Sequence, residues 1–151
     1  MSHKPFLSVL YELARAYQAF DAYSVPHLRT LGLTAPQFDV VATLGNTKGM
    51  GFKELGEKTL ITKGTLTGVV DRLEAKKIVR RVASPSDGRC QIVQLTKAGD
   101  ALFAKVFPAH LNHVEQVFAD FSQKDLDRME ATLQQLKEAF LAGNIQKAEA
   151  A

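Results

Sequence analysis

The sequence predicts a mainly α-helical fold with one small β-hairpin. Apolar residues recur at every third or fourth position over most of the chain, which is the spacing of amphipathic helices. A short helical stretch and a longer one near the middle are separated by only two residues. After Lys77 the pattern becomes β-rich and is interrupted by Pro85 and the Asp87-Gly88 step, as in a hairpin. The 151 residues, 46% of them hydrophobic, suffice for one domain with a buried core.

Two helices are predicted at the N-terminal end. The first extends from Phe6 to Tyr23, and Pro26 is expected to end it because proline cannot donate a backbone hydrogen bond. The second begins at Thr34, whose hydroxyl and the Gln37 side chain form a capping box. Gly45 is expected to end this helix.

The middle of the chain is predicted to hold a helix pair and a hairpin. The helices extend over residues 52–59 and 62–76 and meet at a tight turn. The hairpin has two strands, over residues 79–84 and 89–95, joined by turn-forming residues. Gly49 lacks the strand-then-helix context of a phosphate-binding loop, so we interpret it and the neighbouring Gly51 as part of a linker.

Two longer helices are predicted at the C-terminal end. Thr96 caps the first, which extends from about Lys97 to Asp120. The segment from Ser122 to Asp125 has the pattern of a capping box and begins the last helix. This helix is expected to continue through Phe140 and to end at Gly143.

The chain is therefore expected to form a single domain, residues 1–151, with three regions. Residues 5–46 provide N-terminal dimerisation and support helices, residues 50–97 a winged helix-turn-helix lobe, and residues 98–142 C-terminal dimerisation helices. The net charge of the chain is only +3, but residues 48–97 carry eleven Lys or Arg against five acidic residues, which gives +6. The charge distribution thus favours an anionic partner for the middle region.

The apolar faces of the terminal helices predict a homodimer, because they exceed what one small core can bury. The alternative is a single monomeric core that takes up all of these residues. The residues expected at the dimer interface are Phe6, Leu10, Leu13, Tyr17, Val114, Val117, Phe118, Leu133, Leu136 and Phe140.

A helix pair followed by a basic hairpin is typical of a winged helix-turn-helix, whose second helix enters the major groove of double-stranded DNA. The start of that helix carries short hydroxyl groups, glycine and one cation, namely Thr62, Lys63, Gly64, Thr65 and Thr67. We interpret one of Gly64 and Gly68 as a position of close backbone approach to DNA. The alternative is that the threonines only cap the helix and the glycines only serve packing.

The hairpin adds a candidate minor-groove contact. Arg89 follows the turn, and Asp87 is expected to orient its guanidinium. Arg72 is placed for a phosphate or for an ion pair with Asp71 or Glu74. Further phosphate contacts are expected from Lys53 and Arg81. The alternative for each charge is an ordinary solvated surface group.

Three segments together resemble the MarR family of bacterial transcription regulators. They are LGEKTLITKGTLTGVVDRLEAKKIV at residues 55–79, DGR at 87–89 and LTKAG at 95–99. By this resemblance, Thr62, Lys63, Thr65 and Thr67 lie on the groove-facing helix, and Asp87 and Arg89 at the wing tip. Leu60 and Lys77 depart from the pattern, because glycine is usual at both positions.

The resemblance implies a homodimeric repressor that binds a pseudo-palindromic operator. It also implies release of the DNA by a small anionic or phenolic effector, whose site the sequence does not identify. An alternative function is a winged helix module that binds proteins and not DNA. We find no convincing catalytic constellation and expect neither an enzyme nor a cofactor.

Other features of the sequence point to a cytoplasmic protein without a membrane partner. No apolar run approaches the roughly 18 residues of a membrane span. Cys90, the one cysteine, excludes an internal disulfide and is interpreted as a strand residue and not as a redox sensor. His110 and His113 have a spacing that allows metal binding, but we expect no metal site.

Overall fold

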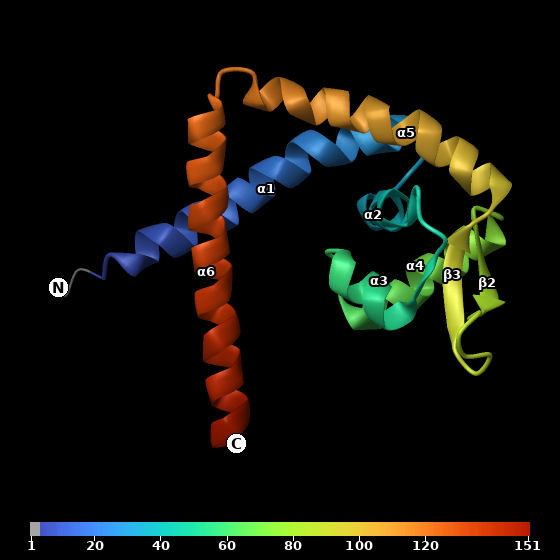
Figure 1. Cartoon of the computed structure of the whole chain (residues 1–151). Coiled ribbons are helices and arrows are strands. Elements are labelled where there is room, and N and C mark those ends of the chain that lie inside the picture. Colours follow the sequence, from blue (N-terminus) through green and yellow to red (C-terminus); the bar gives the residue numbers. More distant parts are fainter. Residues whose placement is uncertain (1–3) are drawn as a thin grey trace. The chain divides into compact units, whose positions relative to one another are not determined.

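The computed structural model describes residues 4–151, apart from the side chain of Lys63. It confirms a mainly helical fold with a small antiparallel sheet, whose elements are labelled in Figure 1. In chain order they are α1 (Phe6–Thr30), α2 (Ala35–Leu44), β1 (Met50–Gly51), α3 (Phe52–Lys58), α4 (Lys63–Ala75), β2 (Val79–Ala83), β3 (Gln91–Leu95), α5 (Lys97–Glu115), the short 3-10 helix η1 (Gln116–Phe118) and α6 (Gln123–Ala150). The chain divides into two compact units, the first ending at Val114 and the second comprising Glu115–Ala151.

Helix α1 continues through Pro26 to Thr30, so the prediction that Pro26 ends it is wrong. A proline inside a helix removes one backbone hydrogen bond, and here the helix resumes for a further turn. The helix ends at Thr30, and Gly32, two residues further on, has a φ of 78° in the left-handed region. The N–H of the next residue, Leu33, donates a hydrogen bond to the carbonyl of Leu28. The side chain of Leu28 is buried and keeps the last turn of α1 against the core.

The predicted boundaries of α2 are confirmed. Thr34 Oγ1 accepts a hydrogen bond from the Gln37 N–H at 3.2 Å, and Gln37 Oε1 accepts one from the Thr34 N–H at 3.1 Å. The helix ends at Gly45, as expected. A Cβ at Gly45 would overlap the ring of Phe103 on α5, so this glycine permits the close approach of α5.

Helices α3 and α4 form the predicted pair and enclose the core of the first unit. Each helix begins and ends within one residue of its expected bounds. The fully buried side chains of this core come from α2, α3, α4 and the sheet, and they are Val40, Val41, Leu44, Leu55, Val70, Leu73, Val79 and Val93. Apolar packing along the buried face of α4 therefore fixes the position of the helix and leaves its other face exposed.

The sheet has three strands in the order β1-β3-β2, whereas the sequence predicted two. In the hairpin, Val79 pairs with Leu95. The extra strand is β1, in which Met50 pairs with Val93, so Gly51 is a strand residue and not part of a linker. Two residues are too few to show the alternation of a strand in the sequence.

The chain leaves α4 through Lys77, whose φ is 60°. The N–H of Lys77 donates to the carbonyl of Glu74, and that of Ile78 to the carbonyl of Leu73, both at 2.9 Å. These bonds form the helix end that usually contains glycine at the left-handed position. At Lys77, where the family pattern usually has glycine, this chain therefore places a lysine in the left-handed conformation.

Helix α5 ends at Glu115 and passes into η1, so it is shorter than the predicted end at Asp120. Helix α6 continues to Ala150, so the predicted end at Gly143 is wrong. Gly143 is helical, and the residues after it are mainly Ala, Gln, Lys and Glu, which favour helix. Among residues 4–151, no helix combines the length and apolar character that crossing a bilayer requires.

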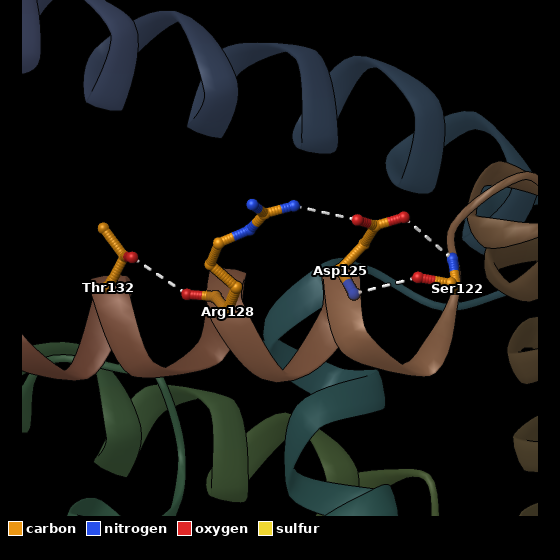
Figure 2. A network of polar contacts seen from close by, with 4 residues as sticks. All are labelled: Ser122, Asp125, Arg128 and Thr132. Atoms are coloured by element: carbon orange, nitrogen blue, oxygen red, sulfur yellow. Dashed lines mark hydrogen bonds and ion pairs between the residues drawn. The ribbon is translucent and has the colours of Figure 1, made fainter.

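Helix α6 begins with the predicted capping box, which Figure 2 shows together with the next two turns. Ser122 Oγ accepts a hydrogen bond from the Asp125 N–H at 3.1 Å, and Asp125 Oδ2 accepts one from the Ser122 N–H at 3.0 Å. These bonds, the backbone one foremost, lower the pKa of Asp125. Arg128 donates to Asp125 Oδ1, and Thr132 Oγ1 donates to the Arg128 carbonyl.

Candidate nucleic-acid interface

The start of α4 presents exposed hydroxyl groups on a helix that is fixed by its buried face. Thr62, Thr65 and Thr67 are exposed, whereas Leu66 is buried. The alternative that Thr62 caps the helix is not what the geometry shows, because its side chain accepts no backbone N–H of α4. Its Oγ1 lies 3.0 Å from Thr65 Oγ1, so the two hydroxyls form a pair at the surface. The side chain of Lys63 lies outside the described residues.

The glycines of α4 are not required by packing against the described residues. A Cβ added to Gly64 would meet no atom within 4 Å, and one added to Gly68 would meet only Arg72 Nη1, at 3.9 Å. Glycine in a helix costs about 1 kcal/mol relative to alanine. A helix surface without side chains at these positions lets another molecule approach the backbone closely.

Arg81 joins the hairpin to α4. Its guanidinium lies 2.5 Å from Asp71 Oδ1 and 2.6 Å from Glu74 Oε1, and its Cζ lies 5.4 Å from the ring centre of Phe52. The side-chain hydrogen bond to Asp71 is the largest of the contacts that raise the pKa of Arg81. Only 20% of the Arg81 side chain is exposed. This arginine therefore fixes β2 against α3 and α4, a role that the sequence did not indicate.

The acidic partners that were expected for Arg72 are taken by Arg81. None of the ion pairs among the described residues involves Arg72, whose side chain is exposed on α4. Lys53 on α3 is exposed as well. Both cations therefore lie at the surface of the helix pair.

The tip of the hairpin is exposed and held by local bonds. The N–H of Ser84 donates to the carbonyl of Cys90 at 2.8 Å. Asp87 Oδ1 accepts a hydrogen bond from the backbone N–H of Arg89 at 3.0 Å, so Asp87 shapes the turn backbone. Among the described residues, its carboxylate forms no ion pair with the Arg89 guanidinium, which differs from the expected orienting role. Cys90 is exposed in the turn, one residue before β3, and is not the strand residue that was expected.

A residue that the sequence did not single out connects α2 to the turn before α4. Asp39 Oδ2 accepts a hydrogen bond from the Leu60 N–H at 2.7 Å. Burial raises the pKa of the Asp39 carboxyl, and the bond from Leu60 lowers it by less. The Leu60 side chain is 81% exposed, so the turn is held through its backbone and not through apolar packing of Leu60. An acid within an apolar helix is the only sequence signal for this contact.

A cavity of about 300 Å³ lies between α1, α2 and α5, beside that turn. Its polar lining includes Asp21, Ser24, Asp39 and His110, and none of the described lining residues is Lys or Arg. Ser24 Oγ is buried and has no hydrogen-bond partner among the described residues. The cavity therefore offers acceptor and hydroxyl groups to a small molecule but no fixed cation.

The residues expected at a dimer interface lie mainly at the surface of each unit. In α1, Phe6, Leu10, Leu13 and Tyr17 are 39% to 57% exposed. In the second unit, Val117, Phe118, Leu133 and Phe140 are 42% to 58% exposed, and Leu136 is partly buried. Val114 on α5 is partly buried as well. So many large apolar side chains at the surface favour contact with another molecule.

A helix pair with an exposed second helix and a hairpin beside it defines a winged helix-turn-helix protein. The MarR family model matches residues 33–91. The HTH-type transcriptional regulator MhqR of Bacillus subtilis (strain 168) is 30% identical over 121 residues, which cover 80% of this chain and 83% of that protein. The homoprotocatechuate degradative operon repressor of Escherichia coli is 27% identical over 128 residues, covering 85% of this chain and 86% of that protein.

The fold comparison agrees with the sequence comparison. A solved structure that addresses regulation of DNA binding of Bordetella bronchiseptica BpsR by 6-hydroxynicotinic acid superimposes with a TM-score of 0.79 and 26% identity, covering 91% of this chain and 98% of that one. The chain belongs to the MarR family. It is a DNA-binding transcription regulator and not an enzyme.

Proposed function

We propose that the protein is a homodimeric repressor that binds a pseudo-palindromic operator. The observation that carries this proposal is the exposed hydroxyl and glycine surface at the start of α4, with an exposed arginine on the neighbouring hairpin. Thr62, Lys63, Thr65 and Thr67 contact base edges in the major groove, and Gly64 allows the helix to approach the DNA.

The remaining predicted residues divide into contacting and positioning groups. Arg89 enters the minor groove, and the exposed Lys53 and Arg72 contact phosphates. Arg81 holds the hairpin against α4, which supports a positioning role in place of the phosphate contact expected from the sequence. Asp87 likewise shapes the wing tip.

A duplex selection with the purified full-length protein tests the DNA-binding part of this proposal. We expect a dyad-symmetric sequence to be enriched and bound at least about 10³-fold more tightly than scrambled DNA. Its affinity is expected to fall steeply with salt, because phosphate contacts release counterions. Absence of enrichment together with a flat salt dependence would instead support the protein-binding alternative. Transcription from a promoter that contains the selected site distinguishes repression from activation.

The dimer proposal rests on the exposed apolar residues of α1 and α6. Leu133→Glu places a charge among them and is expected to shift the protein from dimer to monomer in sedimentation equilibrium. Gln135→Glu, an exposed residue on the same helix, is the matched control and is expected to remain dimeric. A Leu133→Glu protein that sediments like the unmodified chain would contradict the role of α6 in pairing.

We further propose that a small aromatic molecule with a hydroxyl donor releases the DNA from the cavity beside Asp39. The carboxylates of Asp21 and Asp39 disfavour a bound anion, and the unpartnered Ser24 hydroxyl offers a hydrogen bond. Between the anionic and phenolic classes expected from the sequence, this lining favours the phenolic one.

Phenol and 6-hydroxynicotinic acid, the second taken from the BpsR structure, are suitable probes for this choice. Phenol is expected to release the selected operator at lower concentration than the acid. Ser24→Ala is expected to weaken the effect of phenol and to leave operator affinity without phenol unchanged. Stronger release by the acid would contradict the phenolic assignment.

A further inference from the structure

Three histidine rings join α1 to α5 in the first unit. His27 Nδ1 on α1 lies 3.0 Å from His110 Nδ1 on α5. The ring of His27 also stacks on that of His113, with centroids 4.1 Å apart and planes 6° apart. His110 is 6% exposed, so the contact between the two Nδ1 atoms is shielded from water on one side.

The distance between the two Nδ1 atoms constrains their protons. A hydrogen bond at 3.0 Å needs one N–H donor and one unprotonated acceptor. The pair therefore shares a single Nδ1 proton, and at least one of His27 and His110 is neutral. Full protonation of both rings would place two N–H groups and two positive charges against each other.

Among the described residues, no carboxylate forms a hydrogen bond or ion pair with the three rings that would stabilise their positive charge. On α1, Tyr23 stacks on His113 at 4.2 Å and its hydroxyl donates to the His113 carbonyl. On α2, the edge of Phe38 meets His110 at 4.7 Å, while Asp39 and, from α1, Asp21 line the same cavity as His110. None of the hydrogen bonds recorded for the described residues joins one of these imidazoles to a carboxylate. The three rings are also not placed as a metal site.

We propose that His27 and His110, with the ring of His113 stacked on His27, form a proton-sensitive latch between α1 and α5, which is closed while the pair shares one Nδ1 proton and opens as both of its rings become protonated. The latch goes beyond the proposed DNA and effector binding. Its consequence for function is that acidification loosens the helix that carries the exposed apolar residues Phe6 to Tyr17.

The direction of the pH effect follows from the protonation of both rings. Burial lowers the pKa of His27 and of His110, and the charges of the neighbouring histidines lower them further. The unfolded chain therefore binds more protons than the folded one at mildly acidic pH. The stability contributed by the latch is complete above the ordinary histidine pKa of about 6.5 and is lost as the pH falls below it.

Titration of the imidazole signals of the full-length protein by NMR is the first test. We expect the His27 and His110 signals to titrate below the ordinary histidine value and the Tyr23 signals to shift with them. Ordinary or raised midpoints for both rings would overturn the proposal. This measurement needs no variant, so it remains decisive if a substituted chain fails to fold.

Urea unfolding across pH is the second test, with His27→Asn as the variant. Asparagine keeps a neutral hydrogen-bonding atom near the position of Nδ1 but takes up no proton. From about pH 7.5 to about pH 5.5, the urea midpoint of the unmodified protein is expected to fall, and His27→Asn to lose at least half of that fall. Arg29→Gln, an exposed charge change two residues away, is expected to retain it. An unchanged fall in His27→Asn would contradict the latch. Because neither readout involves DNA, the result is independent of the proposed repressor function.

Discussion

The carboxylate of Asp39 on α2 holds the backbone N–H of Leu60, 21 positions further along the chain, at 2.7 Å. Leu60 lies in the turn that leads into α4, and Asp39 also lines the cavity between α1, α2 and α5. One side chain thus touches both the candidate effector site and the segment that sets the start of the candidate recognition helix. A ligand that bonded to Asp39 Oδ2 would compete with Leu60 for the same oxygen.

Asp39→Ala removes this bond and is expected to lower the free energy of unfolding by about 1 to 3 kcal/mol, because a hydrogen bond to a charged group is lost. Asp39→Asn keeps an acceptor and is expected to cost less. Urea unfolding measures both values. Equal midpoints for Asp39→Ala and the unmodified protein would show that the turn holds its position without the carboxylate.

Arg81→Ala removes the ion pairs between β2 and α4 and is expected to destabilise the protein by about 1 kcal/mol, since its partners Asp71 and Glu74 are about half exposed. It is also expected to weaken operator binding, because the hairpin loses its fixed position beside the helix. Arg80→Ala is the control for stability, because Arg80 is exposed on the same strand and its side chain bonds only to the partly buried Gln94 side chain among the described contacts. The idea fails if Arg80→Ala is as destabilising as Arg81→Ala in thermal unfolding.

Arg89→Ala is expected to reduce affinity for the selected operator by about 1 to 3 kcal/mol without changing the unfolding midpoint, because the side chain is exposed at the wing tip. The loss should be larger for operators with a narrow, A·T-rich minor groove opposite the wing. Fluorescence anisotropy with labelled duplexes measures it. Arg128→Ala, an exposed arginine on α6, is expected to bind as tightly as the unmodified protein.

Thr65→Val keeps the shape of the side chain and removes the hydroxyl on α4. We expect lower affinity for the operator and little change for scrambled DNA, because a base-edge contact carries sequence preference. Thr132→Val makes the same change on α6 and is the control, because among the described residues its hydroxyl bonds only to the Arg128 carbonyl. If both duplexes lose affinity equally with Thr65→Val, the hydroxyl contacts phosphate and not a base.

Lys77→Gly is expected to stabilise the protein by about 0.5 to 1 kcal/mol, because a side chain in the left-handed region is strained and glycine is not. Lys76→Gly removes the same charge one residue earlier, where φ is −83°, and is expected to destabilise. Opposite signs for the two variants in urea unfolding confirm the strain. A loss of stability with Lys77→Gly would refute it.

Local chemistry allowed much of the fold to be predicted from the sequence. The capping boxes at Thr34 and Ser122 and the helix end at Gly45 depend on neighbouring residues, and all three are present. The end of α1 was misplaced because a proline removes only one hydrogen bond, and the rest of the structure decides whether the helix resumes. Strand β1 was missed because its pairing partner lies more than forty residues away.

The candidate site divides in the same way. The exposed threonines of α4 followed from helix periodicity, since the apolar positions around them had to face the core. The partners of Arg81 and Asp39 are on other elements, so nothing near them in the sequence distinguishes them from surface charges. Their roles became visible only once β2 was placed against α4, and α2 against the turn at Leu60.

The hairpin is anchored to the rest of the first unit at one end only, the end away from its turn. At the anchored end, β1 pairs with β3, and Gln94 Nε2 donates a hydrogen bond to the Lys48 carbonyl. A Cβ at Gly49 would overlap the Val93 carbonyl, so glycine allows the two segments to lie close together there. Towards the tip, the recorded bonds of the turn stay within residues 84–90. Because the support lies at one end, the amplitude of backbone motion is expected to increase with distance from it. The rate of amide hydrogen exchange should therefore increase from Val93 towards Gly88. The tip can then follow grooves of different width while the anchored end keeps its orientation.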